Sequence, residues 1–134
     1  MAATYLIDTN ICIYITKHHP LSVMHRFERL QPGDVVMSFI TYGELLFGAE
    51  KSSYRESTVK KLQRLVELIP IELPGPEIST HYGKIRAHLE KRGRPIGAND
   101  LWIAAHARSR EMTLVSNNLK EFERVPGLRM ENWA

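Results

Sequence analysis

The chain has 134 residues, 43% hydrophobic and 25% charged, which is the usual size and composition of one globular domain. Its net charge of +3 permits a nucleic-acid partner without demanding one. A single cysteine, Cys12, excludes an internal disulfide framework and fits a reducing, cytoplasmic compartment. Met1 leads directly into the first predicted strand, and no apolar run approaches the length that spans a bilayer, so we expect neither a signal peptide nor a membrane partner.

Hydrophobic spacing predicts strands and helices along the whole chain. In chain order the pattern predicts a strand at 5–7, helices at 11–15 and 21–30, a strand at 35–38, a helix from 41, a helix at 55–69, a strand at 69–73, helices at 76–91 and 98–110, a strand at 113–116, a short helix at 119–124 and a last strand at 128–130. Pro70 predicts an edge position for the third strand. Alternation of this kind predicts parallel strands with right-handed crossovers. No repeat or linker interrupts it, so we expect a single domain over residues 1–134.

The first predicted strand ends in three polar residues, Asp8, Thr9 and Asn10, where the apolar run gives way to a helix. Ligands of open α/β sheets bind just beyond the carboxyl ends of the strands. Asp8 is therefore the first candidate for chemistry. The alternative is that Asp8 or Thr9 only caps the helix that follows, which is an ordinary use of both residues.

Glu44 and Asp100 occupy the same kind of position, in the first turn of a predicted helix at the end of the sheet where ligands bind. Each also has a purely structural interpretation. Thr41-x-x-Glu44 has the pattern of a capping box, and Asp100 could simply complement a helix dipole. Asp100, however, keeps the spacing of the buried apolar residues that follow it, which are Ile103, Ala104 and Ala107.

A buried carboxylate needs a partner, because burying it unpaired is costly. No Lys or Arg is adjacent in sequence to Asp8, Glu44 or Asp100. One divalent cation shared among the three acids would supply that partner. Oxygen ligands favour Mg²⁺ or Mn²⁺, and such ions clamp phosphate oxygens and activate water for in-line displacement. With a mildly basic surface, this chemistry indicates a phosphodiester backbone as the substrate.

Several sequence blocks, spread over the chain, carry a resemblance to a known family. They are Leu6-Ile7-Asp8-Thr9-Asn10, Thr41-Tyr42-Gly43-Glu44-Leu45 with Gly48-Ala49, Arg92-Gly93-Arg94-Pro95-Ile96-Gly97, Asn99-Asp100-Leu101-Trp102-Ile103-Ala104-Ala105-His106-Ala107, Leu114-Val115-Ser116-Asn117-Asn118, Glu121-Phe122 and Val125-Pro126-Gly127-Leu128. Together and in this order they resemble the PIN-domain ribonucleases, and within them the VapC-type toxins of bacterial toxin–antitoxin modules. The match runs essentially end to end.

The resemblance implies a three-layer α/β/α sandwich with a central parallel sheet, and Mg²⁺-dependent cleavage of RNA. It implies that Asp8, Glu44 and Asp100 are the catalytic, metal-binding acids. Many PIN domains carry a fourth acid where this chain has Asn118, and Glu121 is close enough in sequence to substitute, which leaves a second metal ion open. The polar residues implied to surround the acids are Thr9, Asn10, Ser116 and Asn118, and Asn10 is expected to help orient Asp8.

The same resemblance implies hydrolysis by metal-activated water, leaving 5′-phosphate and 3′-hydroxyl ends, because no 2′-hydroxyl attack is required. Structured RNA such as tRNA is the usual substrate class of such toxins. A VapB-like antitoxin is the implied partner, in a hetero-oligomer that contains a toxin homodimer. Candidate phosphate contacts, each with a solvated surface position as the alternative, are Arg86, Arg92, Arg94, Arg108 and Arg110.

Other functional classes fit the sequence less well. Aspartyl-phosphate enzymes usually need a second acid two residues after the first, where this chain has Asn10. Receiver domains need an Asp after the third strand, which here ends in Pro74-Gly75-Pro76. The six histidines lack the ligand spacings of a zinc enzyme. A non-catalytic PIN-like module that binds RNA without cleaving it is the alternative that remains open.

Overall fold

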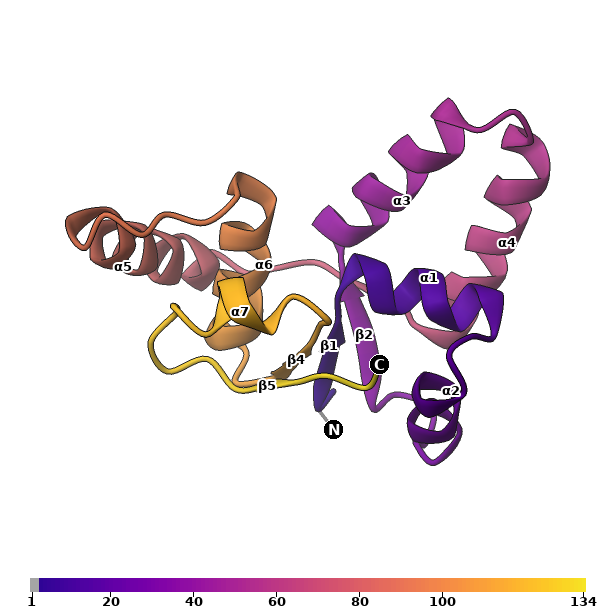
Figure 1. Cartoon of the computed structure of the whole chain (residues 1–134), viewed down its shortest axis with the longest axis horizontal. Coiled ribbons are helices and arrows are strands. Elements are labelled where there is room, and N and C mark those ends of the chain that lie inside the picture. Colours follow the sequence, from indigo (N-terminus) through magenta and orange to yellow (C-terminus); the bar gives the residue numbers. More distant parts are fainter. Residues whose placement is uncertain (1–2) are drawn as a thin grey trace.

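The computed structural model describes residues 3–134, which form five strands and seven helices (Figure 1). The strands are β1 (Tyr5–Ile7), β2 (Val35–Ser38), β3 (Ile71–Glu72), β4 (Thr113–Val115) and β5 (Met130–Glu131). The helices are α1 (Thr9–Lys17), α2 (Leu21–Glu28), α3 (Phe39–Lys51), α4 (Arg55–Leu68), α5 (Glu77–Lys91), α6 (Ala98–Ser109) and α7 (Leu119–Phe122). Each element predicted from the sequence is present, and the ends differ by a few residues.

The strands form one parallel sheet in the order β3-β2-β1-β4-β5. In its centre Leu6 pairs with Val36 on one side and with Leu114 on the other. β3 lies at an edge and is only two residues long, which confirms the position predicted from Pro70. Because every pair is parallel, the carboxyl ends of all five strands meet at one edge of the sheet.

Helices cover both faces of the sheet and make a three-layer sandwich, as the resemblance implied (Figure 1). Ile7 of β1 points into the core beneath α1, α3 and α4, where it joins Leu62. The preceding residue, Leu6, points into the opposite core beneath α5 and α6, where it joins Ile85. Successive strand residues face opposite sides, so one short apolar strand supplies both cores.

The start of α3 differs from the prediction. Ser38, the last residue of β2, is the N-cap, and its Oγ accepts a hydrogen bond from Ile40 N at 3.2 Å. α3 therefore begins at Phe39, and the proposed capping box of Thr41 and Glu44 is wrong. Thr41 is buried, and Glu44 lies in the second turn instead of the first. Glu44 therefore has no capping role that would explain its presence.

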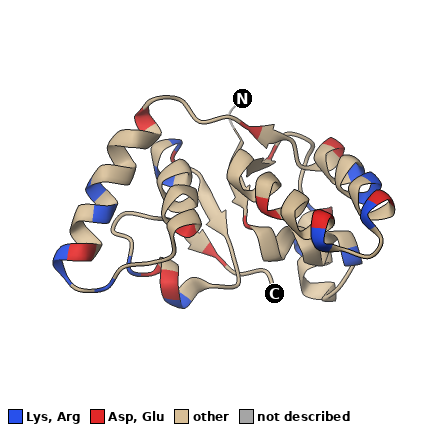
Figure 2. Ribbon diagram, turned by 90° about the horizontal axis from the view of Figure 1, so that it is seen from above, with Lys and Arg blue, Asp and Glu red and all other residues tan. Residues whose placement is uncertain are grey.

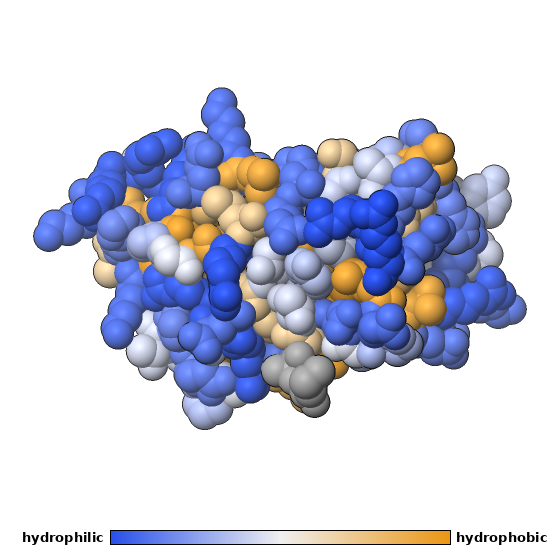
Figure 3. Space-filling view, turned by 90° about the horizontal axis from the view of Figure 1, so that it is seen from below, coloured by the Kyte–Doolittle hydropathy of each residue, from blue (hydrophilic) through white to orange (hydrophobic). Residues whose placement is uncertain are grey.

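Charged and apolar residues are unevenly distributed over the surface. Figure 2 looks onto the carboxyl ends of the strands and shows many of the Lys and Arg residues on α4, on α5 and on the loop after α5. Figure 3 shows the opposite face, which is mostly hydrophilic with small, separate apolar patches. Among residues 3–134, no helix is long and apolar enough to cross a bilayer.

Candidate active site

Asp8 follows β1 directly and lies at the carboxyl edge of the sheet, where the residue is only 6% exposed. Its Oδ1 accepts a hydrogen bond from Thr9 N at 2.8 Å, which makes Asp8 the N-cap of α1. Its Oδ2 accepts a hydrogen bond from Ser116 Oγ, also at 2.8 Å, just after β4. Asp8 therefore caps a helix, and the end of the neighbouring strand fixes its second oxygen.

Glu44 is held on both sides of its carboxylate. Thr9 Oγ1 donates a hydrogen bond to Oε1 at 2.6 Å, and Asn99 Nδ2 of α6 donates one to Oε2 at 3.4 Å. Thr9 is the residue after Asp8, so the first bond brings Glu44 alongside Asp8. The second bond joins α3 to the first turn of α6, where Asp100 lies.

Asp100 and Glu121 form the other half of the cluster and share a hydrogen bond. Glu121 Oε1 also accepts from Gly97 N at 2.7 Å, and its Oε2 accepts from Asn118 Nδ2 at 2.7 Å. A Cβ built on Gly97 would lie 3.7 Å from Glu121 Oε1 and 3.8 Å from Asp100 Oδ2. Both carboxylates therefore face the same backbone turn at the start of α6.

Burial dominates the ionisation of Asp8 and raises its pKa above the ordinary value. The hydrogen bonds from Ser116 and Thr9 N offset part of that rise, because they stabilise the carboxylate. The negative charges of Glu44 and Glu121 add to it. The ionised form of Asp8 is thus less favourable in this site than in water.

Asp100 is affected more strongly. Burial raises its pKa to about 7, and the charges of Asp8, Glu121 and Glu44 add to the rise. Burial opposes the ionisation of Glu121 as well, but its hydrogen bonds bring its pKa below the ordinary value. Without a cation and near neutral pH, Asp100 therefore tends to stay protonated, and its O–H donates a hydrogen bond to Glu121.

The four acids carry more negative charge than their surroundings neutralise. Within residues 3–134 none of them forms an ion pair with Lys or Arg, although Arg124 lies near enough to favour the ionised form of Glu121. Oxygen donors of this kind suit a hard divalent cation. In the described part of the chain, no three carboxylate, imidazole or thiol groups already lie at metal-ligand spacing. The residues fit such an ion by charge and chemistry, and the carboxylates must move towards it.

Comparisons with known proteins identify the family of this chain. A family model described as the PIN domain matches residues 5–128. The chain belongs to the PIN-domain family. It is 47% identical over 130 residues to "Ribonuclease VapC2" of Haemophilus influenzae and 45% identical to "tRNA(fMet)-specific endonuclease VapC" of Shigella flexneri, covering 97% of this chain and 98% of each relative. The structure of VapBC-1 from nontypeable Haemophilus influenzae superposes with a TM-score of 0.90 at 44% identity, over 97% of this chain and 98% of that one. Within the family the chain groups with the VapC ribonucleases.

The structure places most of the polar residues expected around the acids of this PIN domain beside them. Thr9 contacts Glu44, Ser116 contacts Asp8, and Asn118 contacts Glu121. Asn10 does not orient Asp8 as expected. Its Nδ2 instead donates to Asn117 Oδ1 at 3.2 Å, because the start of α1 directs the side chain across to the loop after β4.

The arginines of this PIN domain separate into two groups. Arg92 and Arg94 are exposed and lie on the segment that leads to Gly97, whose N–H donates to Glu121; Arg92 also contacts His88 Nδ1 at 2.9 Å. Arg108 and Arg110 lie at the opposite end of α6 from Asp100. Their guanidinium groups already bind neighbours within the fold, which are His81 and the Pro126 carbonyl for Arg108 and the carboxylates of Glu72 and Glu77 for Arg110. The remaining candidate, Arg86 of α5, is bonded to Glu90 and Tyr82.

Sequence reasoning missed two groups that hold the acids of this PIN domain in place. Gly97 contributes only its backbone N–H, and Asn99 contributes a side-chain amide to Glu44. Gly97 ends one of the sequence blocks that carry the family resemblance and Asn99 begins the next, which was the available signal. A backbone donor carries no side-chain signature, so the bond from Gly97 N to Glu121 could not be identified from the sequence.

Proposed function

We propose that this chain is a Mg²⁺-dependent endoribonuclease that acts as the toxin of a toxin–antitoxin pair. One observation supports this most directly. Asp8, Glu44, Asp100 and Glu121 come from four separate parts of the chain and gather at the carboxyl edge of the sheet, with no ion-pair partner among residues 3–134. Such a cluster is costly to fold unless a cation joins it, and groups with strongly perturbed pKa values are typical of functional sites.

In this proposal Asp8 and Asp100 hold the ion, and Mn²⁺ is an alternative to Mg²⁺. Glu44 either joins them or orients the attacking water as a base. Glu121 lies beside Asp100 and is the candidate for a fourth acid. When bound, the ion neutralises phosphate oxygens and activates water for in-line hydrolysis. The products we expect carry 5′-phosphate and 3′-hydroxyl ends.

The substrate we propose is a structured RNA, and tRNA in particular. The support is the Shigella flexneri relative, which is named a tRNA(fMet)-specific endonuclease and is 45% identical over nearly the whole chain. Arg92 and Arg94 are the best-placed phosphate contacts, because they precede the turn that carries Gly97. Sequencing the 5′ ends of RNAs that are cut after brief expression identifies the target.

The decisive experiment is Asp8→Asn, which preserves shape and removes the charge. We expect the variant to fold, to lose Mg²⁺-dependent RNA cleavage and to lose toxicity. Glu67→Gln, which neutralises an exposed carboxylate of α4, is the matched control and should cleave at the wild-type rate. Cleavage by Asp8→Asn at the wild-type rate would end the catalytic assignment.

EDTA separates this function from the non-catalytic alternative. A metal-dependent nuclease loses RNA cleavage in EDTA and regains it when Mg²⁺ is added in excess. A PIN-like module that only binds RNA keeps its RNA affinity in EDTA and shows no cleavage in either condition. A wild-type protein that behaved in the second way would establish the alternative.

The partner we propose is a VapB-like antitoxin, bound by a homodimer of this chain. Solved VapBC structures that are 38–44% identical to this chain over 97–98% of its length support it. Co-expression with the antitoxin should suppress toxicity and yield a stable complex by size-exclusion chromatography with light scattering. A toxin that stays monomeric and unbound in that experiment would contradict both parts.

A further inference from the structure

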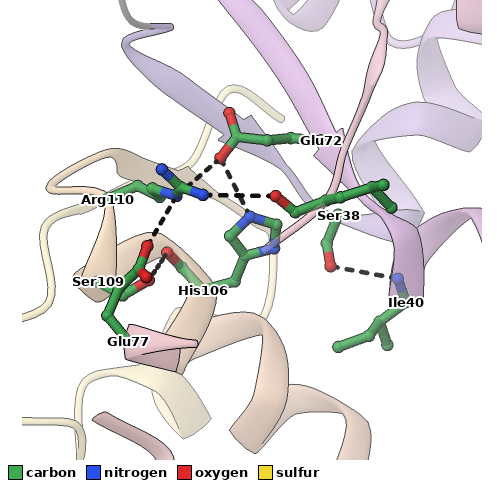
Figure 4. Close-up of polar contacts among 8 residues, drawn as sticks. Ser38, Ile40, Glu72, Glu77, His106, Ser109 and Arg110 are labelled. Carbon is green, nitrogen blue, oxygen red and sulfur yellow. Dashed lines mark hydrogen bonds and ion pairs between the residues drawn. The ribbon is translucent and has the colours of Figure 1, made fainter. Parts of the chain in front are cut away.

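A second polar cluster, separate from the four acids, centres on the buried His106 of α6 and reaches the surface through its other members (Figure 4). The His106 side chain is fully buried. Its Nε2 lies 3.2 Å from Glu72 Oε1 on the edge strand β3. The same oxygen lies 3.4 Å from Arg110 Nε, and that nitrogen lies 3.4 Å from Glu77 Oε1 of α5. An apolar side chain would be enough to pack α6 at this position, so the bond between a buried imidazole and a carboxylate calls for another explanation.

The other ring nitrogen of His106, Nδ1, is buried and has no hydrogen-bond partner among the described residues. In Figure 4 this side of the ring faces Ser38. Ser38 is the register partner of Glu72 on the neighbouring strand, so the two side chains belong to the same part of the sheet. The hydroxyl of Ser38 already accepts from Ile40 N and still has a proton to donate. His106 thus stands between Glu72 and the residue that caps α3.

This placement matters because α3 and α6 carry two of the four acids. Glu44 is on α3 and Asp100 is on α6. Among residues 3–134 the one side-chain hydrogen bond between the two helices is the long 3.4 Å contact from Asn99 to Glu44. We propose that His106 is a positioning residue that, through Glu72 and Ser38, fixes the start of α3 against α6 and so sets the spacing of Glu44 and Asp100 for a divalent ion. The inference rests on the proposed function only in assuming that these acids bind such an ion.

Burial favours the neutral form of the ring, and the contact with Glu72 places the proton of that neutral ring on Nε2. Glu72 of β3 accepts that proton, and the amino-terminal end of α3 places partial positive charge opposite Nδ1. The positive charge of Arg110, the C-cap residue of α6, lowers the pKa of the ring, and the negative charge of Glu77 in α5 partly offsets this effect. Consistently, burial keeps the pKa of His106 below its ordinary value, although Glu72 opposes the shift. An uncharged ring can receive a hydrogen bond on Nδ1 while donating one from Nε2.

Three substitutions at His106 separate its two contacts. His106→Gln keeps an N–H donor near the place of Nε2, and His106→Asn keeps a polar atom near the place of Nδ1. His106→Leu fills part of the space and has neither. Ile85→Val, which opens a small gap in the core beneath α5 and α6, is the control for general loss of stability. If His106→Leu fails to fold, the two amide variants and Glu72→Gln carry the test.

Two measurements are made on each variant, and neither depends on RNA cleavage. The first is the Mn²⁺ concentration that half-maximally raises the melting temperature, since an ion that binds only the folded state stabilises it. The second is hydrogen exchange in EDTA at the Ile40 amide, which Ser38 caps. We expect His106→Leu to need about tenfold more Mn²⁺, the usual scale for residues that orient metal ligands, with faster exchange at Ile40. Each amide variant should recover part of the loss, and Ile85→Val should change neither quantity.

The outcomes separate this inference from the proposed function. If the His106 variants keep the wild-type Mn²⁺ requirement, with or without faster exchange, His106 has a structural role alone and the inference is overturned. If Ile85→Val raises the Mn²⁺ requirement as much as His106→Leu does, the effect is general destabilisation and the inference is again overturned. If the wild-type protein itself shows no stabilisation by Mn²⁺ or Mg²⁺, the proposed function fails and the metal link of His106 fails with it.

Discussion

Asp100 should lower the stability of this protein whenever the site lacks a cation, so replacing it should make the metal-free protein more stable. Its pKa rises from 3.8 in a free chain to about 7 in the fold. The folded state therefore binds the proton more tightly than the unfolded state. The stability that this proton contributes is fully present below about pH 4 and is lost as the pH rises through 7. At pH 8 the ionised Asp100 lowers the free energy of unfolding of the wild type. Asp100→Asn carries no charge there and avoids this loss.

The size of the effect follows from the shift in pKa. Without screening by solvent, a rise in pKa of this size would lower the free energy of unfolding at pH 8 by about 4 kcal/mol. Asp100 is only half-buried, so we reduce this to roughly 2 kcal/mol. For a domain of this size, that predicts a melting temperature roughly 5–10 °C higher for Asp100→Asn in EDTA at pH 8. Asparagine can still donate a hydrogen bond to Glu121, so no large packing cost opposes the gain.

The assay is thermal unfolding followed by circular dichroism, for wild type and Asp100→Asn, at pH 4 and pH 8, in EDTA and in excess Mg²⁺. The advantage of the variant should be present at pH 8 in EDTA and should vanish at pH 4, where wild-type Asp100 is protonated. Mg²⁺ should raise the melting temperature of wild type and leave the variant nearly unchanged. A variant no more stable than wild type at pH 8, or equally favoured at both pH values, would refute this reasoning.

Three further predictions follow from the contacts of single side chains. Ser116→Ala removes the donor to Asp8 Oδ2 and should lower the unfolding free energy in EDTA at pH 8 by roughly 1–3 kcal/mol in urea titrations; an unchanged midpoint would contradict the contact. Arg94→Ala should raise the KM for RNA and leave the melting temperature alone, whereas Arg110→Ala should lower the melting temperature and leave the KM alone, because Arg110 is tied to carboxylates within the fold; the opposite pattern would reverse their roles. Cys12 is fully buried and burial raises its thiol pKa, so the folded protein should not react with a thiol reagent until it is unfolded; rapid native labelling would show that the site opens.

Much of the architecture follows from sequence periodicity alone. Apolar runs as short as residues 5–7 predict strands, and the helices between them oblige those strands to run parallel. Parallel strands bring their carboxyl ends to one edge, which is why Asp8 and Ser116, far apart in sequence, meet by a hydrogen bond. The position of Asp8 as a candidate for chemistry, and the edge position next to Pro70, were therefore already determined by the order of the residues.

The sequence by itself thus determined the sheet, its layers and the edge at which polar residues gather. Only the tertiary structure decided which of those residues touch. It moved Glu44 from a capping box to the second turn of α3, turned Asn10 towards Asn117, and paired Asp100 with Glu121 of α7. The physical reason is one of range: periodicity reports on neighbours within one element, whereas the partner of a buried charge is set by how separate elements pack in space.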